Sequence, residues 1–154
     1  MAKTQLYFFV REDDMRKKGL GLLIGMAITS LTYAANVSVL VSFSMPDQLL
    51  EETLKDCMRL KIPAYLNGLH RNSMQETAVR VMELSQKIPD LNLQIDPTLF
   101  ERFGIQQVPA LVVENNNSFD VIYGHLPLTE GLMRITGRGD SGLTAADVRR
   151  ISGE

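Results

Sequence analysis

The sequence is poor in several residue types that would indicate a particular chemistry. It contains one cysteine, two histidines and no tryptophan in 154 residues. A single cysteine cannot form an internal disulfide, a C-x-x-C redox pair or a cysteine zinc cage. Two histidines without ligand spacing are more often surface residues than a metal site. We therefore expect the protein to hold neither a metal nor another cofactor.

The chain also lacks an excess of charge of either sign. It has 16 Lys and Arg against 18 Asp and Glu, which gives a formal net charge of -2. Such a chain offers no broad basic field for a phosphate backbone, and its aromatic content of 6% provides no RNA-stacking platform. Nucleic acid is therefore not an expected partner. The hydrophobic content of 45% is sufficient for the core of one domain.

Residues 1–34 have the features of an N-terminal extension followed by a secretory signal peptide. A basic segment at Met15–Lys18 precedes an apolar run over 19–31, and the small residues Thr32 and Ala34 suit a signal peptidase. The apolar run is shorter than the ~20 residues that a membrane span needs, which disfavours a retained anchor. We expect cleavage after Ala34 and function outside the cytoplasm. Translation starts at either Met1 or Met15.

Strand and helix patterns alternate over the rest of the chain. The order is β-α-β-α-β-(short α)-β-β-α, which predicts an α/β domain over 35–136 with a central mixed sheet flanked by helices. After Gly137 the apolar spacing gives way to Gly, Ser and charges, so 137–154 is predicted to be a flexible C-terminal tail with at most a short helix at 145–151. The expected strands are 36–43, 62–66, 91–95, 109–113 and 118–123, and the expected helices are 44–59, 73–88, 97–103 and 128–135.

Helix starts are marked by capping patterns. Ser44 followed by Asp47, and Ser73 followed by Glu76, have the spacing of a capping box. Asp96 before Pro97 is most simply a helix N-cap.

One proline opens the most apolar strand of the chain. A proline inside a sheet is confined to strand starts, edges or bulges, so Pro109 is predicted to begin the strand over 109–113. The Val108-Pro109 peptide is a candidate for the cis form, and an ordinary trans proline is the alternative.

This succession of elements, with a proline-led strand in a hairpin, resembles the thioredoxin-like fold. Redox members of that fold open their first helix with C-x-x-C, and the matching segment here is Ser44–Asp47. Both sulfurs are absent. Because thiol exchange requires a thiolate to attack a disulfide, the resemblance implies a domain without redox activity.

Three blocks of sequence resemble the TrbC family. They are SFSMP at 42–46, IDPTLF at 95–100 and FGIQQVPALVV at 103–113. The resemblance implies a periplasmic, non-enzymatic protein that assembles the pilus of an F-type conjugative type IV secretion system. It also implies a TraW-like assembly protein as partner and no small-molecule substrate. Peripheral association with a membrane secretion complex is compatible with this role.

Two hypotheses of function remain. In the first, the domain is a scaffold that binds its partner through an exposed Met45 and its surroundings. In the second, it is an enzyme or isomerase that uses Cys57, His70 or His125. Cys57 lies on the apolar face of a predicted helix, where a buried thiol is the simpler interpretation. The residues expected to contact a partner are Ser44, Met45, Pro46, Gln107, Val108 and Pro109.

Overall fold

A five-stranded sheet organises the protein, with strand order β3-β2-β1-β4-β5. The computed structural model describes residues 35–154, so the predicted extension and signal peptide over 1–34 lie outside the described residues. The central strand β1 (Asn36–Val41) pairs parallel with β2 (Ala64–Leu66) and antiparallel with β4 (Ala110–Glu114). The edges are β3 (Leu93–Ile95), parallel to β2, and β5 (Phe119–Tyr123), antiparallel to β4. The predicted α/β class and mixed sheet are confirmed.

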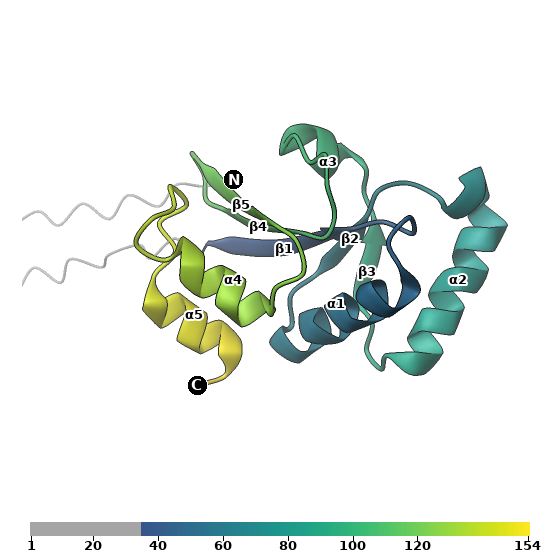
Figure 1. The fold of residues 1–154 in the computed structure, drawn as a ribbon, viewed down its shortest axis with the longest axis horizontal. Helices are drawn as coiled ribbons and strands as arrows, with labels where there is room; N and C mark the ends of the chain where they lie inside the picture. Colours follow the sequence, from purple (N-terminus) through teal and green to yellow (C-terminus); the bar gives the residue numbers. More distant parts are fainter. Residues whose placement is uncertain (1–34) are drawn as a thin grey trace, which may run out of the picture. The chain divides into compact units, whose positions relative to one another are not determined.

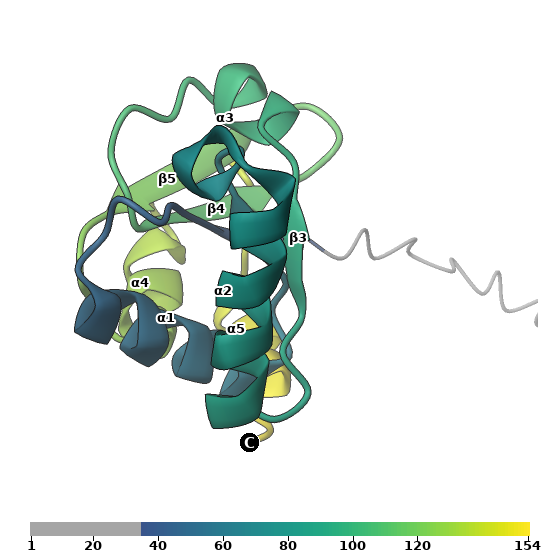
Figure 2. The ribbon, with the colours of Figure 1, turned by 90° about the vertical axis from the view of Figure 1, so that its right-hand side faces the viewer.

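The helices follow the predicted succession, with one added 3-10 turn. Figure 1 shows α1, α4 and α5 on one side of the sheet and α3 on the other, and Figure 2 shows α2 alongside α1. Within residues 35–154, no helix combines the length and the hydropathy needed to cross a membrane. The helices are α1 (Asp47–Leu60), α2 (Met74–Lys87), α3 (Thr98–Arg102), α4 (Leu128–Ile135) and α5 (Ala145–Ser152), with an added 3-10 turn η1 (His70–Asn72).

Two apolar clusters lie on the two faces of the sheet. Because successive strand residues point to opposite faces, β4 contributes to both clusters. Leu111 and Val113 join the cluster under α1, α2, α4 and α5, whereas Ala110 and Val112 join Phe100 and Phe103 under α3. The first cluster is much the larger, so most of the helical packing is on one face.

The two predicted capping boxes have different outcomes. The Ser73 hydroxyl accepts a hydrogen bond from the Glu76 N–H at 3.2 Å and caps α2, as predicted. The prediction for Ser44 is wrong, because α1 begins at Asp47 with Pro46 as its N-cap residue. Ser44 lies too far before the first turn, and its hydroxyl donates instead to Ser42 Oγ at 3.0 Å.

Asp96 lies one residue before Pro97, the N-cap residue of α3, although its carboxylate makes the kind of contact expected of a cap. Its Oδ1 accepts hydrogen bonds from the Thr98 N–H at 3.0 Å and from the Thr98 hydroxyl. Thr98 is the first residue of α3, so the carboxylate satisfies a backbone donor that has no partner within the helix.

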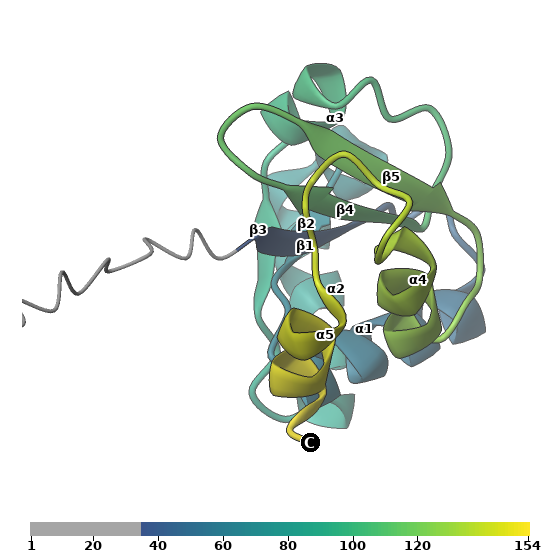
Figure 3. The ribbon, with the colours of Figure 1, turned by 90° about the vertical axis from the view of Figure 1, so that its left-hand side faces the viewer.

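The C-terminal segment is packed against the domain. Leu143 and Val148 are buried in the large cluster, with Val148 1% exposed, and α5 lies beside α4 (Figure 3). The predicted short helix is confirmed, but a tail free of the domain is the wrong description of this segment. Its few apolar residues are spaced among Gly, Ser and charged residues, which hides the pattern. Thr144 and Asp147 form a capping box that starts α5.

Hydrogen bonds tie the loop between α4 and α5 to the β4–β5 hairpin. Asn115 Nδ2 donates to the Ser141 carbonyl at 2.8 Å. The Asp120 carboxylate accepts from the N–H groups of Asp140 and Ser141, each at 2.9 Å. Gly139 is needed at this point, since a Cβ there would come within 2.2 Å of Asp120 Oδ2.

Truncating the buried side chain of α5 tests this packing. We expect Val148→Ala to lower the free energy of unfolding by about 1–3 kcal/mol, because it removes buried apolar surface and leaves a cavity. Arg149→Ala, at the exposed neighbour, is the matched control and should change it by less than about 0.5 kcal/mol. Urea unfolding measures both, and equal effects would show that α5 is not packed.

The loop contact should also make stability depend on pH. Burial raises the pKa of Asp120, but hydrogen bonds from Ser141 and from the Asp140 N–H outweigh it and leave the pKa below its usual 3.8. The contribution of the ionised carboxylate is therefore present above pH 3.8 and is lost as pH falls through the lowered pKa. We expect Asp120→Asn to be less stable than the wild type at pH 6, and the difference to shrink in acid. Glu101→Gln, on the exposed side of α3, is the control; a pH-independent difference for Asp120→Asn would contradict this assignment.

Candidate functional site

The two groups of predicted partner-binding residues lie at the same end of the inner strands β1 and β4. Leu40 near the end of β1 pairs directly with Ala110 at the start of β4. The segment that leaves β1 at Ser42 and the segment that enters β4 through Pro109 therefore lie at this end of the two strands. The Val108-Pro109 peptide is cis, so the first of the two sequence-based alternatives is confirmed.

Only some of the predicted residues are open to a partner. Ser44, Pro46 and Gln107 are exposed, and Val108 is half-buried. Met45 is only 6% exposed and belongs to the large core cluster, so the expectation of an exposed Met45 is wrong. Pro109 is also buried. The part that remains accessible, here called the cis-proline surface, consists of Ser44, Pro46, Gln107 and Val108.

The burial of Met45 follows from the turn that connects β1 to α1. The Met45 N–H donates to the Ser42 carbonyl at 3.1 Å, which closes a tight turn directly after the strand. Polar residues of the turn take the outer positions. The apolar side chain then lies against the helix-covered face of the sheet, where burial is favourable.

A cavity of about 420 Å³ adjoins Pro109 on the helix-covered face. This volume lies within the range of ~300–1,000 Å³ typical of ligand pockets. We call it the α1–α4 cavity, because it lies between α1, the start of α4 and the loop over 124–127. Its apolar lining comprises Val39, Pro109, Leu111, Ile122, Leu126, Pro127 and Leu128.

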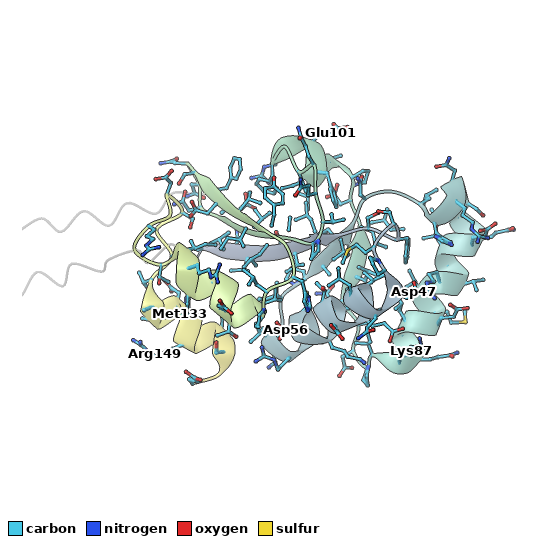
Figure 4. All side chains as sticks on the ribbon, viewed as in Figure 1. Asp47, Asp56, Lys87, Glu101, Met133 and Arg149 are labelled. Carbon is cyan, nitrogen blue, oxygen red and sulfur yellow. The ribbon has the colours of Figure 1, made fainter. Side chains whose placement is uncertain are left out.

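Two local features hold the walls of this cavity. Asp56 on α1 accepts a hydrogen bond from the Leu128 N–H at 2.7 Å and so binds the first residue of α4, which has no side-chain cap of its own. Figure 4 labels Asp56 on the side of α1 toward α4. Gly131 lets α4 approach the sheet, since a Cβ there would lie 2.7 Å from Leu111 Cδ2. The distance between α4 and β4 therefore depends on this glycine.

The polar side chains of the cavity lining come from α1 and from the loop over 124–127. Glu52, Lys55 and Arg59 line it from α1, and His125 lines it from the loop. His125 Nε2 lies 3.5 Å from Glu52 Oε2. Acids and bases are thus mixed around an apolar floor, an arrangement that suits an apolar side chain next to a polar backbone.

Sequence reasoning missed this cavity because its walls come from four separate segments. Val39, Asp56, Pro109 and Leu128 are each ordinary in sequence, and only the fold brings them together. The one available signal was Gly131 on the apolar face of an amphipathic helix, since such a glycine often marks a close approach.

Cys57 is not arranged for catalysis. It is 0% exposed in the large cluster, as predicted for a buried thiol. Burial, and then the nearby charge of Asp56, raise its pKa to about 12, so the reactive thiolate is scarce at neutral pH.

The two histidines stand apart from any group of candidate ligands. The His70 ring packs edge-to-face on Phe43 with 5.3 Å between centroids, and His125 is exposed. No group of three or more His, Cys, Asp or Glu residues in the described part of the chain is placed to hold a metal ion.

Comparison with known proteins gives one family and one curated relative. Residues 39–144 match the family described as type-F conjugative transfer system pilin assembly protein, TrbC. The chain is 37% identical over 114 residues to the periplasmic protein TrbC of Escherichia coli strain K12. This alignment covers 74% of the chain and 54% of the relative, so the chain spans about half the length of that protein. No solved structure matches the chain significantly.

The burial of Cys57 leads to a direct chemical test. We expect the thiol of the folded protein to resist iodoacetamide at pH 8 and to react fully in denaturant, because modification requires the core to open. Mass spectrometry over time measures the extent of modification. Reaction of the folded protein at the rate of an exposed cysteine would support a catalytic role for Cys57.

Proposed function

Because the chain belongs to the TrbC family of type-F conjugative transfer system pilin assembly proteins, we propose that it works in the periplasm as a protein-binding scaffold without redox activity. In this proposal its partner is a TraW-like assembly protein. The partner docks on the cis-proline surface and places an apolar side chain in the α1–α4 cavity.

The observation that carries the proposal is the position of the cavity. Pro109 follows the cis peptide at the end of the strands where the cis-proline surface lies, and it also lines the cavity. An extended segment crossing the exposed Pro46 and Gln107 could therefore continue into an apolar recess. Binding of an anchoring side chain in a pocket, surrounded by less critical contacts, is how protein interfaces concentrate their binding energy.

A thioredoxin-like interpretation of the fold belongs to the same proposal. The element order, the mixed sheet and the cis proline before β4 support it. In redox members of that fold the corresponding surface holds an extended peptide by backbone hydrogen bonds. We infer that this chain keeps the peptide-binding surface and has lost the chemistry, since Ser44–Asp47 contains no cysteine.

A catalytic alternative has less support. The buried thiol of Cys57 lies in the core, and its raised pKa opposes the ionisation that a nucleophile needs. His70 and His125 come from separate parts of the fold and neither is paired with a nucleophile in the described hydrogen bonds. The proposed role therefore excludes catalysis.

The proposal is tested by placing charge on the cis-proline surface. Pro46→Glu should preserve the fold, since Pro46 is exposed and a carboxylate at a helix N-cap is favourable. It should weaken binding of the TraW-like partner about tenfold or more, equivalent to ~1.4 kcal/mol, because a charge must be desolvated at the contact. Titration calorimetry with the purified partner measures the affinity.

Met82→Glu is the matched control, since it adds the same charge to an exposed apolar position on α2. It should bind as the wild type does. Leu126→Glu separately tests the cavity and should also weaken binding. If Pro46→Glu remains folded and binds with unchanged affinity, the partner does not use this surface.

A further inference from the structure

The outer edge of β5 is an unprotected strand edge, and we propose that it pairs with β5 of a second copy of this chain. The two strands would run antiparallel about a twofold axis at Val121 and would join two sheets into one. This proposal does not depend on the partner proposed above, because it uses the outward backbone groups of Phe119, Val121 and Tyr123, which neither belong to the cis-proline surface nor line the α1–α4 cavity.

The register of the hairpin shows which backbone groups of β5 point outward. Gly124 N–H donates to the Pro109 carbonyl at 3.0 Å, and Asn115 N–H donates to the Ser118 carbonyl at 2.9 Å. In an antiparallel ladder such hydrogen-bonded pairs alternate with pairs that point away from each other. Ile122 and Asp120 therefore face β4, opposite Leu111 and Val113. The backbone N–H and carbonyl groups of the intervening residues Phe119, Val121 and Tyr123 point away from β4, toward the open edge of the sheet.

These outward groups make no hydrogen bonds within the described part of the chain. Among residues 35–154, no hydrogen bond outside the strand ladder involves the N–H or carbonyl of Phe119, Val121 or Tyr123. Each of the three residues presents one donor and one acceptor, at the two-residue spacing of a strand edge. This pattern specifies an extended backbone as the occupant, because a helix has already paired its own backbone groups.

The side chains of the same residues form an apolar strip beside the edge. Phe119, Val121 and Tyr123 are on the sheet face that α3 covers only in part. Phe119 is 44% exposed and Tyr123 is 43% exposed. The buried Phe103 ring, directly after α3, packs edge-to-face on Phe119 at 5.0 Å between centroids and supports one end of the strip.

The two edges of the sheet differ in their protection. β3 has three residues, and short edge strands offer little to an incoming chain. β5 has five residues and contains neither lysine nor proline. Its one charge, Asp120, is on the other face and is engaged by the N–H groups of Asp140 and Ser141. The strand therefore lacks the lysine and proline that commonly block edge pairing.

A second copy fits this edge because the strand is self-complementary. Antiparallel pairing about Val121 places each Phe119 opposite the Tyr123 of the other copy, on the apolar face. Aromatic cross-strand pairs of this kind are stabilising. On the opposite face each Asp120 lies across from an Ile122, so the pairing opposes no like charges. The net charge of -2 per chain adds little repulsion.

The size of the edge limits the strength of the dimer. Five residues span about 17 Å, which is too little for the ~800 Å² per partner of a stable complex. We therefore expect weak association, with a Kd of about 10⁻⁴ M, that becomes populated where copies are held close together.

Amide hydrogen exchange of the wild-type protein gives the most specific test, because it reports on each outward amide of β5 separately. On raising the concentration from about 10 µM to about 1 mM, across the expected Kd, we expect protection of the amides of Phe119, Val121 and Tyr123 to increase severalfold. The amides of Asp120 and Ile122 should be protected at both concentrations, because they bond to β4. Sedimentation at the higher concentration should show the mass of a dimer.

Val121→Pro removes the central outward donor without touching the ladder to β4, and proline is tolerated on a strand edge facing solvent. It should abolish the dimer, whereas Val79→Ala, on the exposed face of α2, should leave it intact. Tyr123→Ala keeps the backbone and should weaken association, which tests the strip if the proline variant does not fold. A monomer at about 1 mM, or a dimer whose Phe119, Val121 and Tyr123 amides stay unprotected, would overturn the proposal.

Discussion

The burial of β4 on both of its faces is the constraint on which the rest of the structure depends. Leu111 and Val113 pack under the helices, while Ala110 and Val112 pack under α3, and all four are buried. A strand with no polar face cannot lie at an exposed edge of a sheet. β4 is therefore an inner strand, covered by β1 on one side and by the β5 hairpin on the other.

This position of β4 determines where binding surfaces can form. The chain enters this inner strand at the end of the sheet, through the cis Val108-Pro109 peptide, next to the segment that leaves β1. On the helix-covered face Gly131 brings α4 close to Leu111, and Asp56 fixes the start of that helix. The α1–α4 cavity lies in the space that remains between α1 and this end of α4. A helix capped from a neighbouring helix thus defines a wall of the proposed partner site.

Salt bridges add little to this arrangement but connect its helices. Arg80 on α2 pairs with Asp47, and Lys87 pairs with Glu51, so both links run from α2 to the polar side of α1 (Figure 4). Exposed pairs of this kind contribute about 0–1 kcal/mol each. The apolar clusters therefore account for most of the packing energy. The charged residues of α2 mainly fix the orientation of α2 relative to α1.

The sequence was sufficient to predict features that depend on neighbouring residues. The strand opened by Pro109, the Ser73 cap and the buried position of Cys57 are all local patterns, and the structure contains them. Features that depend on distant residues were not predictable. Met45 follows a polar turn and looked exposed, but the tight turn at Ser42 points it into the core. The capping box at Thr144 was overlooked because glycine, serine and charge surround it.

The central claim is that this domain binds a partner and carries out no thiol chemistry. The most direct measurement is complementation of pilus assembly in donor cells that lack the protein, comparing Cys57→Ser with Pro46→Glu at equal amounts of folded protein. The account predicts normal pili with Cys57→Ser and few or none with Pro46→Glu. Loss of pili with folded Cys57→Ser, together with normal pili with Pro46→Glu, would contradict it.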